Sequence, residues 1–153
     1  MLRSIVLPAT GSAYDRATGD LWRHYYEGYI CITTNGCVKS NGECVMGRGV
    51  AFQATQRFPG IAREIGGLIR KGGNHVHVLD RWKLCTLPVK HHWKEEADTA
   101  LIKDSISELE TVADMLQCNF YLPRPGCGNG RLQWSDVRPF LTHLSDRFIV
   151  VNK

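Results

Sequence analysis

The alternation of strand-like and helix-like segments constrains the fold of this chain most strongly. Residues 29–34 are rich in β-branched and aromatic residues and precede Asn35 and Gly36, a pattern that predicts a buried strand. Residues 49–58 have helix-forming composition and stop at a Pro-Gly pair. Apolar residues then recur at spacings of 4, 3, 4 and 3, which predicts a longer helix over about 97–116.

The remaining segments continue the same alternation. We expect an extended stretch at 5–7, a helix over about 61–70, a hairpin of strands 75–79 and 83–87, strands at 119–122 and 147–151, and a helix through Leu144 with Ser135 as N-cap. Strands separated by helices imply a largely parallel sheet covered on both faces. The sequence therefore predicts an α/β protein, a three-layer α/β/α sandwich with a mixed, largely parallel central sheet, as a single domain over 1–153.

Composition excludes several other classes of protein. With 43% hydrophobic and 22% charged residues, the 153-residue chain suits a soluble globular protein. We expect no membrane association and a cytoplasmic location, because no apolar run approaches the roughly 20 residues of a membrane span and the N-terminus has too short an apolar stretch for a signal peptide. The six scattered cysteines lack C-x2-C pairs, so we expect reduced thiols. We also expect no metal, because His75 and His77 share a strand face without a Cys or carboxylate partner nearby, and no cofactor. Nothing in the sequence indicates more than a monomer.

Charge is distributed unevenly along the chain. Residues 94–114 contain seven acidic side chains and two lysines, which gives this segment a charge of −5. Because the net charge of the whole chain is +4, the remaining residues together carry +9. That excess suits a phosphate-bearing ligand, although a solvated acidic helix face opposite an ordinary mixed surface explains it equally well.

Two glycine-rich loops, at 41–49 and 126–130, each lie between a predicted strand and a predicted helix. Ligands of open α/β sheets bind at the carboxyl ends of strands, and backbone amides at a helix N-terminus favour phosphate. The alternative is that the glycines serve only as turn residues. A dinucleotide-binding Rossmann pattern fails here, because the second loop lies near the C-terminus and Asp146 begins the last strand rather than ending one.

Two amide-rich loops from different strands suggest that one ligand with two phosphates lies between them. Asp20 lies on another early loop, where its carboxylate could accept a hydrogen bond from the exocyclic amine of a base. The alternative role for Asp20 is to cap a turn.

Three segments together resemble the macrodomain family, which binds ADP-ribose and often removes it from macromolecules. The resemblance runs from about Thr18 to Val151 and is strongest at 45–51, 90–93 and 122–134. Within the family, the chain looks most like the small phage and bacterial branch near the antitoxins that reverse DNA ADP-ribosylation. It is also similar to the terminal ADP-ribose glycohydrolase and yeast ADP-ribose-1''-phosphate phosphatase groups.

The resemblance implies a ligand-binding set. Asp20 would bind the adenine amine with Leu21 alongside, and the two glycine loops would enclose the diphosphate. Asn35 would contact the distal ribose, with Asn41 as a contender because residues 38–42 look like an insertion. The implied ligand-binding residues are Asp20, Leu21, Thr34, Asn35, Asn41, Val45, Met46, Gly47, Arg48, Gly49, Val50, Pro125, Gly126, Cys127, Gly128, Asn129, Gly130 and Arg131.

Lys90 and Asn35 are the catalytic residues that the resemblance implies. A lysine near the distal ribose is required for cleavage in the DNA-directed antitoxins and the terminal glycohydrolase, and residues 86–93 match the antitoxin version. The alternative is a surface lysine without a role. The terminal glycohydrolase has Asp where this chain has Gly130, whereas the antitoxin branch also has Gly, which favours a nucleic-acid-linked or small-molecule substrate.

The sequence therefore favours an ADP-ribosyl glycohydrolase-type hydrolase that cleaves at C1'' of the distal ribose and removes ADP-ribose from a macromolecule, with DNA as a candidate. The alternatives are a non-catalytic ADP-ribose reader, an ADP-ribose-1''-phosphate phosphatase, or a nucleic-acid-binding module that uses the basic excess. The resemblance implies a phage or bacterial source, with action in the host cytoplasm if the protein is viral.

Overall fold

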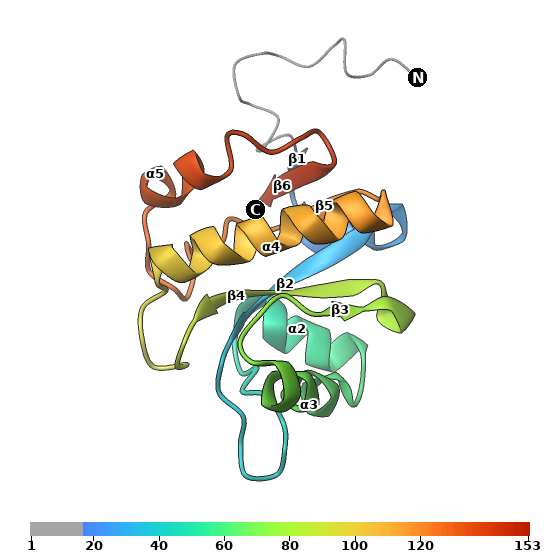
Figure 1. Ribbon diagram of the computed structural model, residues 1–153, viewed down its shortest axis with the longest axis vertical. Helices are drawn as coiled ribbons and strands as arrows, with labels where there is room; N and C mark the ends of the chain where they lie inside the picture. The colour runs from blue at the N-terminus through green and yellow to red at the C-terminus, as the bar shows by residue number, and fades with distance from the viewer. Residues whose placement is uncertain (1–16) are drawn as a thin grey trace.

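A computed structural model describes residues 17–153, and its centre is a six-stranded sheet (Figure 1). The sheet has the order β1-β6-β5-β2-β4-β3, and every neighbouring pair is parallel except β3 with β4. The strands are β1 (Ala17–Thr18), β2 (Tyr29–Asn35), β3 (Val78–Leu79), β4 (Leu84–Lys90), β5 (Phe120–Leu122) and β6 (Phe148–Asn152). The predicted mixed, largely parallel sheet is thus confirmed.

Helices cover both faces of this sheet, α2 and α3 on one side and α4 on the other (Figure 1). The helices are α2 (Gly49–Arg57), α3 (Ile61–Gly72), α4 (Thr99–Leu116) and the short α5 (Trp134–Val137), with 3-10 turns η2 (Leu21–Glu27), η3 (Asp80–Trp82) and η4 (Arg138–Phe140). The three-layer α/β/α prediction is confirmed. None of the helices in residues 17–153 is long and apolar enough to span a membrane.

Two apolar clusters lie on opposite faces of the sheet because side chains alternate along each strand. In β2, Ile30 and Ile32 belong to the cluster under α2 and α3, whereas Cys31 belongs to the cluster under α4. All three side chains are fully buried. The six cysteines, which all lie in the described part of the chain, are free thiols.

The carboxyl ends of β2 and β4 meet with an irregular register. Thr34 pairs with Pro88, but the next residue, Asn35, pairs with Lys90, so Val89 is skipped. Such bulges commonly lie beside functional sites, where they change the direction of a side chain. Here the shift brings Asn35 and Lys90 into neighbouring positions at the carboxyl ends of two inner strands.

The first strand of the predicted hairpin is shorter than expected. The antiparallel pairing is confirmed, but only Val78 and Leu79 form β3. Residues 75–77 bond partly through a side chain: the Thr86 hydroxyl donates to the carbonyl of His75 at 3.2 Å and accepts from the amide of His77 at 2.8 Å. One backbone bond remains, from the amide of Thr86 to the carbonyl of His77 at 2.9 Å. These side-chain bonds replace part of the regular ladder.

The predicted helix over 135–144 is wrong in both its start and its length. The helix begins at Trp134 after Gln133, so Ser135 lies inside it and is not the N-cap. It lasts four residues and continues as η4, which contains Pro139. Proline lacks the amide hydrogen that a continuing α-helix requires.

The other boundaries differ by a few residues. The helix that begins at Ile61 extends to Gly72 and does not end near residue 70. The long helix starts at Thr99, because the Asp98 carboxylate accepts a hydrogen bond from the amide of Ala100 at 2.9 Å. The expected stretch at 5–7 lies outside the described residues.

Candidate functional site

A cavity of about 840 Å³ opens at the carboxyl edge of the parallel strands. The ends of β2 and β4 contribute to its wall, together with the two glycine-rich loops and the turn before η2. Most of the residues singled out in the sequence line it: Asp20, Leu21, Thr34, Asn35, Val45, Met46, Gly47, Arg48, Gly49, Val50, Lys90, Gly126, Gly128, Asn129, Gly130 and Arg131.

Three of the singled-out residues do not line this cavity. Asn41 lies at an exposed turn, where its side chain accepts from the amide of Glu43 at 3.0 Å and donates to the carboxylate of Glu43 at 3.2 Å. Cys127 packs against the apolar cluster under α4, with its thiol 3.5 Å from the carbonyl of Pro125. Asn41, the alternative to Asn35 for the ribose, thus lies at a turn away from the cavity wall, and Pro125 and Cys127 lie behind the lining residues of the second loop.

Asn35 fixes the first loop at its point of entry. Its amide Nδ2 donates to the carbonyl of Val45 at 2.9 Å, and its Oδ1 accepts from the amide of Cys37 at 2.9 Å. The same loop leads into α2, whose N-cap Arg48 makes no side-chain capping hydrogen bond. The first turn of α2 thus presents backbone amides at the cavity, an arrangement that favours an anion.

Close packing fixes the second loop. Gly126 has a φ of +77°, and a Cβ there would lie 2.8 Å from Cδ1 of Ile102. A Cβ on Gly130 would lie 2.7 Å from the Cβ of Ala97 and 2.5 Å from the carbonyl oxygen of Gly126. Gly130 also accepts a hydrogen bond from the amide of Ala97 at 3.0 Å. The loop therefore has no room for the Asp that the terminal glycohydrolase carries at this position.

The two loops approach each other beside Lys90. Its Nζ donates to the carbonyl of Asn129 at 3.2 Å and to the carbonyl of Trp93 at 3.3 Å. Partial burial lowers the pKa of Lys90 below its usual value, and the positive charges of Arg131 and Arg48 lower it further. The amine thus lies inside the cavity wall and has a larger neutral fraction than a solvated lysine.

The charge of the cavity wall is strongly positive. Asp20 is its one acidic residue within 17–153, and it also caps η2 by accepting from the amide of Trp22 at 3.1 Å. Turn capping and contact with a ligand are thus compatible for this carboxylate. The six basic residues of the wall are Arg48, Lys90, Lys94, Arg124, Arg131 and Lys153. This arrangement suits an anionic ligand that has one hydrogen-bond donor group near Asp20.

Several lining residues were not identified from the sequence. Gln53 on α2 accepts a hydrogen bond from the indole of Trp22 at 2.8 Å, and no motif indicated it. Arg124 and Trp93 lie within segments that carry the family resemblance, but the resemblance implies no role for them. Among residues 17–153, no three His, Cys, Asp or Glu side chains come together as a metal site would need.

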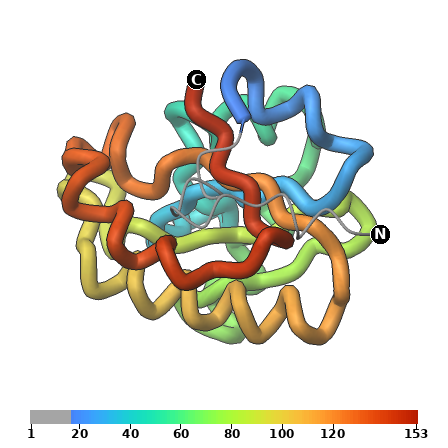
Figure 2. Tube along the Cα trace, turned by 90° about the horizontal axis from the view of Figure 1, so that it is seen from above, coloured from blue at the N-terminus to red at the C-terminus, as the bar shows by residue number. Residues whose placement is uncertain are grey.

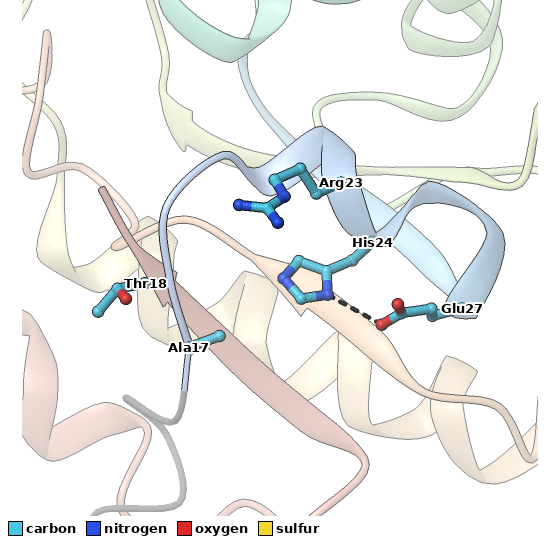
Figure 3. Close-up of a pocket in the computed structure, with 5 residues that line it drawn as sticks. All are labelled: Ala17, Thr18, Arg23, His24 and Glu27. Carbon is cyan, nitrogen blue, oxygen red and sulfur yellow. Dashed lines mark hydrogen bonds and ion pairs between the residues drawn. The ribbon is translucent and has the colours of Figure 1, made fainter.

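A second hollow, of about 330 Å³, lies beside β1 and η2 (Figure 3). Its His24 is hydrogen-bonded to Glu27 at 2.9 Å and stacks on Tyr121 with ring centroids 4.6 Å apart. The side chains of His24 and Glu27 thus already have partners within the protein, and neither glycine-rich loop contributes a residue to this hollow. The larger cavity is therefore the stronger candidate.

In Figure 2 the yellow chain after β4 and the orange chain after β5, which both contribute residues to the larger cavity, lie side by side. Arg131 donates to the carbonyl of Lys94 at 3.5 Å across this junction. The C-terminal strand β6 ends near the turn that carries Asp20, because Gly19 donates to the carbonyl of Asn152 at 2.8 Å.

The sequence of the chain is similar to those of known proteins. No family model matches the chain. It is 28% identical over 130 residues to the DNA ADP-ribosyl glycohydrolase of Mycobacterium tuberculosis, covering 78% of this chain and 35% of that protein. The enzyme of the same name from Thermus aquaticus is 27% identical over 104 residues, covering 61% of this chain and 29% of that protein. The chain thus spans about a third of the length of the curated relatives it matches.

Solved structures give a closer view of the fold. The macrodomain of Mycobacterium tuberculosis DarG superposes with a TM-score of 0.75 at 26% identity, covering 90% of this chain and 95% of that one. The macrodomain of Thermus aquaticus DarG gives a TM-score of 0.70 at 23% identity, with the same coverages. Thermosipho africanus DarTG, solved in complex with ADP-ribose, gives 0.70 at 19% identity over 92% of this chain and 42% of that one.

Proposed function

We propose that this chain, a macrodomain that resembles those of DarG, binds ADP-ribose and removes it from DNA. The observation that carries the proposal is the position of Lys90. Its amine lies between the two amide-rich loops and its backbone is paired with that of Asn35, in a basic cavity at the carboxyl edge of the sheet.

The ligand would lie across the cavity with its diphosphate between the two loops. The amides at the start of α2 and the side chains of Arg48 and Arg131 supply donors and positive charge for that group. The adenine would lie toward Asp20, whose carboxylate accepts from an exocyclic amine. The distal ribose would then reach the end of β4, where Lys90 and Asn35 meet.

Hydrolysis breaks the bond between C1'' and the acceptor base, water supplies the new oxygen at C1'', and the base leaves with a proton. Opening of the ribose ring leaves C1'' joined to the base by a C=N bond, and the neutral Lys90 amine can add to that carbon. The base then leaves with a proton, and water hydrolyses the resulting lysine imine to give ADP-ribose and the free amine. The ammonium form of Lys90 would instead stabilise negative charge on the sugar. The lowered pKa of Lys90 means that its amine loses a proton more readily than a solvated lysine does. Asn35 keeps the first loop, and with it the ribose, in place.

Replacing Lys90 by Ala tests the proposal. We expect release of ADP-ribose from an ADP-ribosylated single-stranded oligonucleotide to fall by about 100-fold or more, the range for loss of a group that stabilises charge in the transition state. Mass spectrometry of the oligonucleotide measures the rate, and calorimetry checks that ADP-ribose affinity is retained. Lys103→Ala, at an exposed position of α4, is the matched control and should retain the full rate. Equal rates for Lys90→Ala and wild type would contradict the role of the lysine.

The same assays separate the two alternative functions. ADP-ribose binding without release from DNA, RNA or protein would identify a reader. Phosphate release from ADP-ribose-1''-phosphate, without cleavage at a base, would identify a phosphatase.

We further propose that the protein acts as a monomer in the cytoplasm of a bacterium or of a phage-infected cell. Six free thiols suit a reducing compartment, and the curated relatives named above are bacterial. Light scattering during gel filtration tests the monomer. The assignment of residues 1–153 to a single domain, and the expected independence from metals and cofactors, stay predictions.

A further inference from the structure

Trp93 presents a large aromatic surface at the mouth of the cavity. Its side chain is 47% exposed and lines the cavity wall. Tryptophan is usually well buried, and Trp93 belongs to neither apolar cluster of the described residues. Its position therefore has no explanation in the packing of the core.

The loop that carries Trp93, residues 91–98, is held at several points. His91 bonds to the carboxylate of Asp98 at 2.8 Å, and the amide of Asp98 donates to the carbonyl of Val89 at 2.9 Å. Ala97 donates to the carbonyl of Gly130 at 3.0 Å, which ties the loop to the second glycine loop. Trp93 is thus presented from an anchored loop rather than from a free segment.

Trp93 is also directly linked to the amine of Lys90. The Nζ of Lys90 lies 3.3 Å from the carbonyl oxygen of Trp93. If Lys90 faces C1'' of the distal ribose, the group attached to C1'' lies next to Trp93. In ADP-ribosylated DNA that group is a nucleobase, which has a flat π-face.

The neighbours of Trp93 suit one base and little more of the strand. The ammonium of Lys94 lies 5.3 Å from the Trp93 ring centroid, and the ring of His92 stacks on it at 5.8 Å. Both side chains are exposed, so a base can replace Lys94 over the indole while Lys94 moves to a phosphate. Glu95 and Glu96 follow in the same loop, are exposed and disfavour phosphates at their own positions.

We propose that Trp93 is the stacking platform for the DNA base that carries ADP-ribose. This inference rests on the proposed function and assigns a residue to recognition of the base. Base–aromatic stacking is sequence-tolerant, and a base must leave the duplex to reach such a platform. Trp93 is therefore a specificity residue that recognises the leaving group.

The test measures how much the base adds to affinity. In a Lys90→Ala background, which prevents turnover, fluorescence anisotropy and competition give the Kd for an ADP-ribosylated oligonucleotide and for free ADP-ribose. The readout is the Kd for free ADP-ribose divided by the Kd for the ADP-ribosylated oligonucleotide. Any effect of Trp93 on the binding of ADP-ribose itself cancels in this ratio. We expect Trp93→Ala to reduce this ratio by about tenfold, within the range of base–aromatic stacking, and Trp93→Phe to retain most of it.

Tyr26→Ala is the matched control, because Tyr26 is 95% exposed and does not line the cavity. It should leave the ratio unchanged. An unchanged ratio in Trp93→Ala, an equal loss in Trp93→Phe, or a parent protein that gains nothing from the base would each overturn the proposal. Failure of the proposed function is a separate result, namely no release of ADP-ribose from DNA by the wild-type protein.

Discussion

The two glycine-rich loops contact one cavity from different strands, but their glycines have different roles. In the first loop, the Asn35 side chain fixes the backbone and Gly47 has no protein atom near the position of a Cβ. In the second loop, Gly126 and Gly130 pack against α4 and the segment before it, with no room for a Cβ. Two loops that look equivalent in composition thus differ in which glycines are structural.

The largest expected effect is that of Gly130→Asp, which introduces the carboxylate found in the terminal glycohydrolase. The new Cβ would overlap Ala97 and the backbone of Gly126, so we expect the free energy of unfolding to fall by about 3 kcal/mol. Urea unfolding followed by circular dichroism measures it. Gly128→Asp, two residues away in open space, is the control and should be nearly neutral. Equal stability of the two variants would contradict the difference between these glycines.

Gly128→Val should separate binding from stability within the second loop. Gly128 lines the cavity, and a Cβ there meets no protein atom within 4 Å. We therefore expect ADP-ribose affinity to fall by about tenfold, or about 1.4 kcal/mol, with unfolding unchanged. Calorimetry measures the affinity. Gly47→Val makes the same test on the first loop, and unimpaired binding in both variants would show that the ligand avoids the loops.

Asn35→Ala tests whether the first loop depends on polar contacts. The variant loses the hydrogen bonds to Val45 and Cys37, so we expect a loss of about 1 kcal/mol in unfolding free energy. Thermal unfolding measures this loss. Asn41→Ala removes a comparable pair of bonds at an exposed turn and should change stability less. The comparison is broken if Asn41→Ala is the more destabilising of the two.

The smallest effect concerns how each loop acts on Lys90. If the neutral amine reacts, the rate on ADP-ribosylated DNA rises with pH, with a midpoint below that of an ordinary lysine. Arg131→Gln removes the stronger of two neighbouring positive charges and should raise that midpoint, whereas Arg48→Gln should raise it less. Single-turnover rates across pH measure both midpoints. A rate that falls as the amine loses its proton would assign the ammonium form instead.

Much of the fold could be predicted because its signals are local. The buried strand that ends at Asn35 and the apolar face of α4 follow from the periodicity of adjacent residues. The alternation of residues 75–79 overestimates the hairpin strand, because two of the hydrogen bonds of residues 75–77 go to the Thr86 hydroxyl and not to the backbone of the neighbouring strand. The short α5 could have been anticipated from Pro139, which stands inside the predicted helix.

The candidate site was predictable mainly where a motif identified it. The positions of Lys90 and Gly130 followed from the family resemblance, but the register shift that brings Lys90 beside Asn35 has no local signal. The crowding of Gly130 by Ala97 joins residues far apart in the sequence, and periodicity carries no information about it. Gln53 and Trp93 line the cavity because of where α2 and the loop after β4 lie in the folded chain, which the sequence around them does not indicate.

The hydrogen bond from Asp98 to Val89 has a consequence for how this protein can diversify. Because it joins the two ends of residues 90–97 before α4 begins, the end of β4 and the start of α4 remain connected when the exposed segment 91–96 changes. That segment contributes Trp93 and Lys94 to the cavity wall, so a changed loop alters the cavity and leaves the core intact. Residues 91–96 are therefore the part of the wall that can vary at the lowest cost to folding.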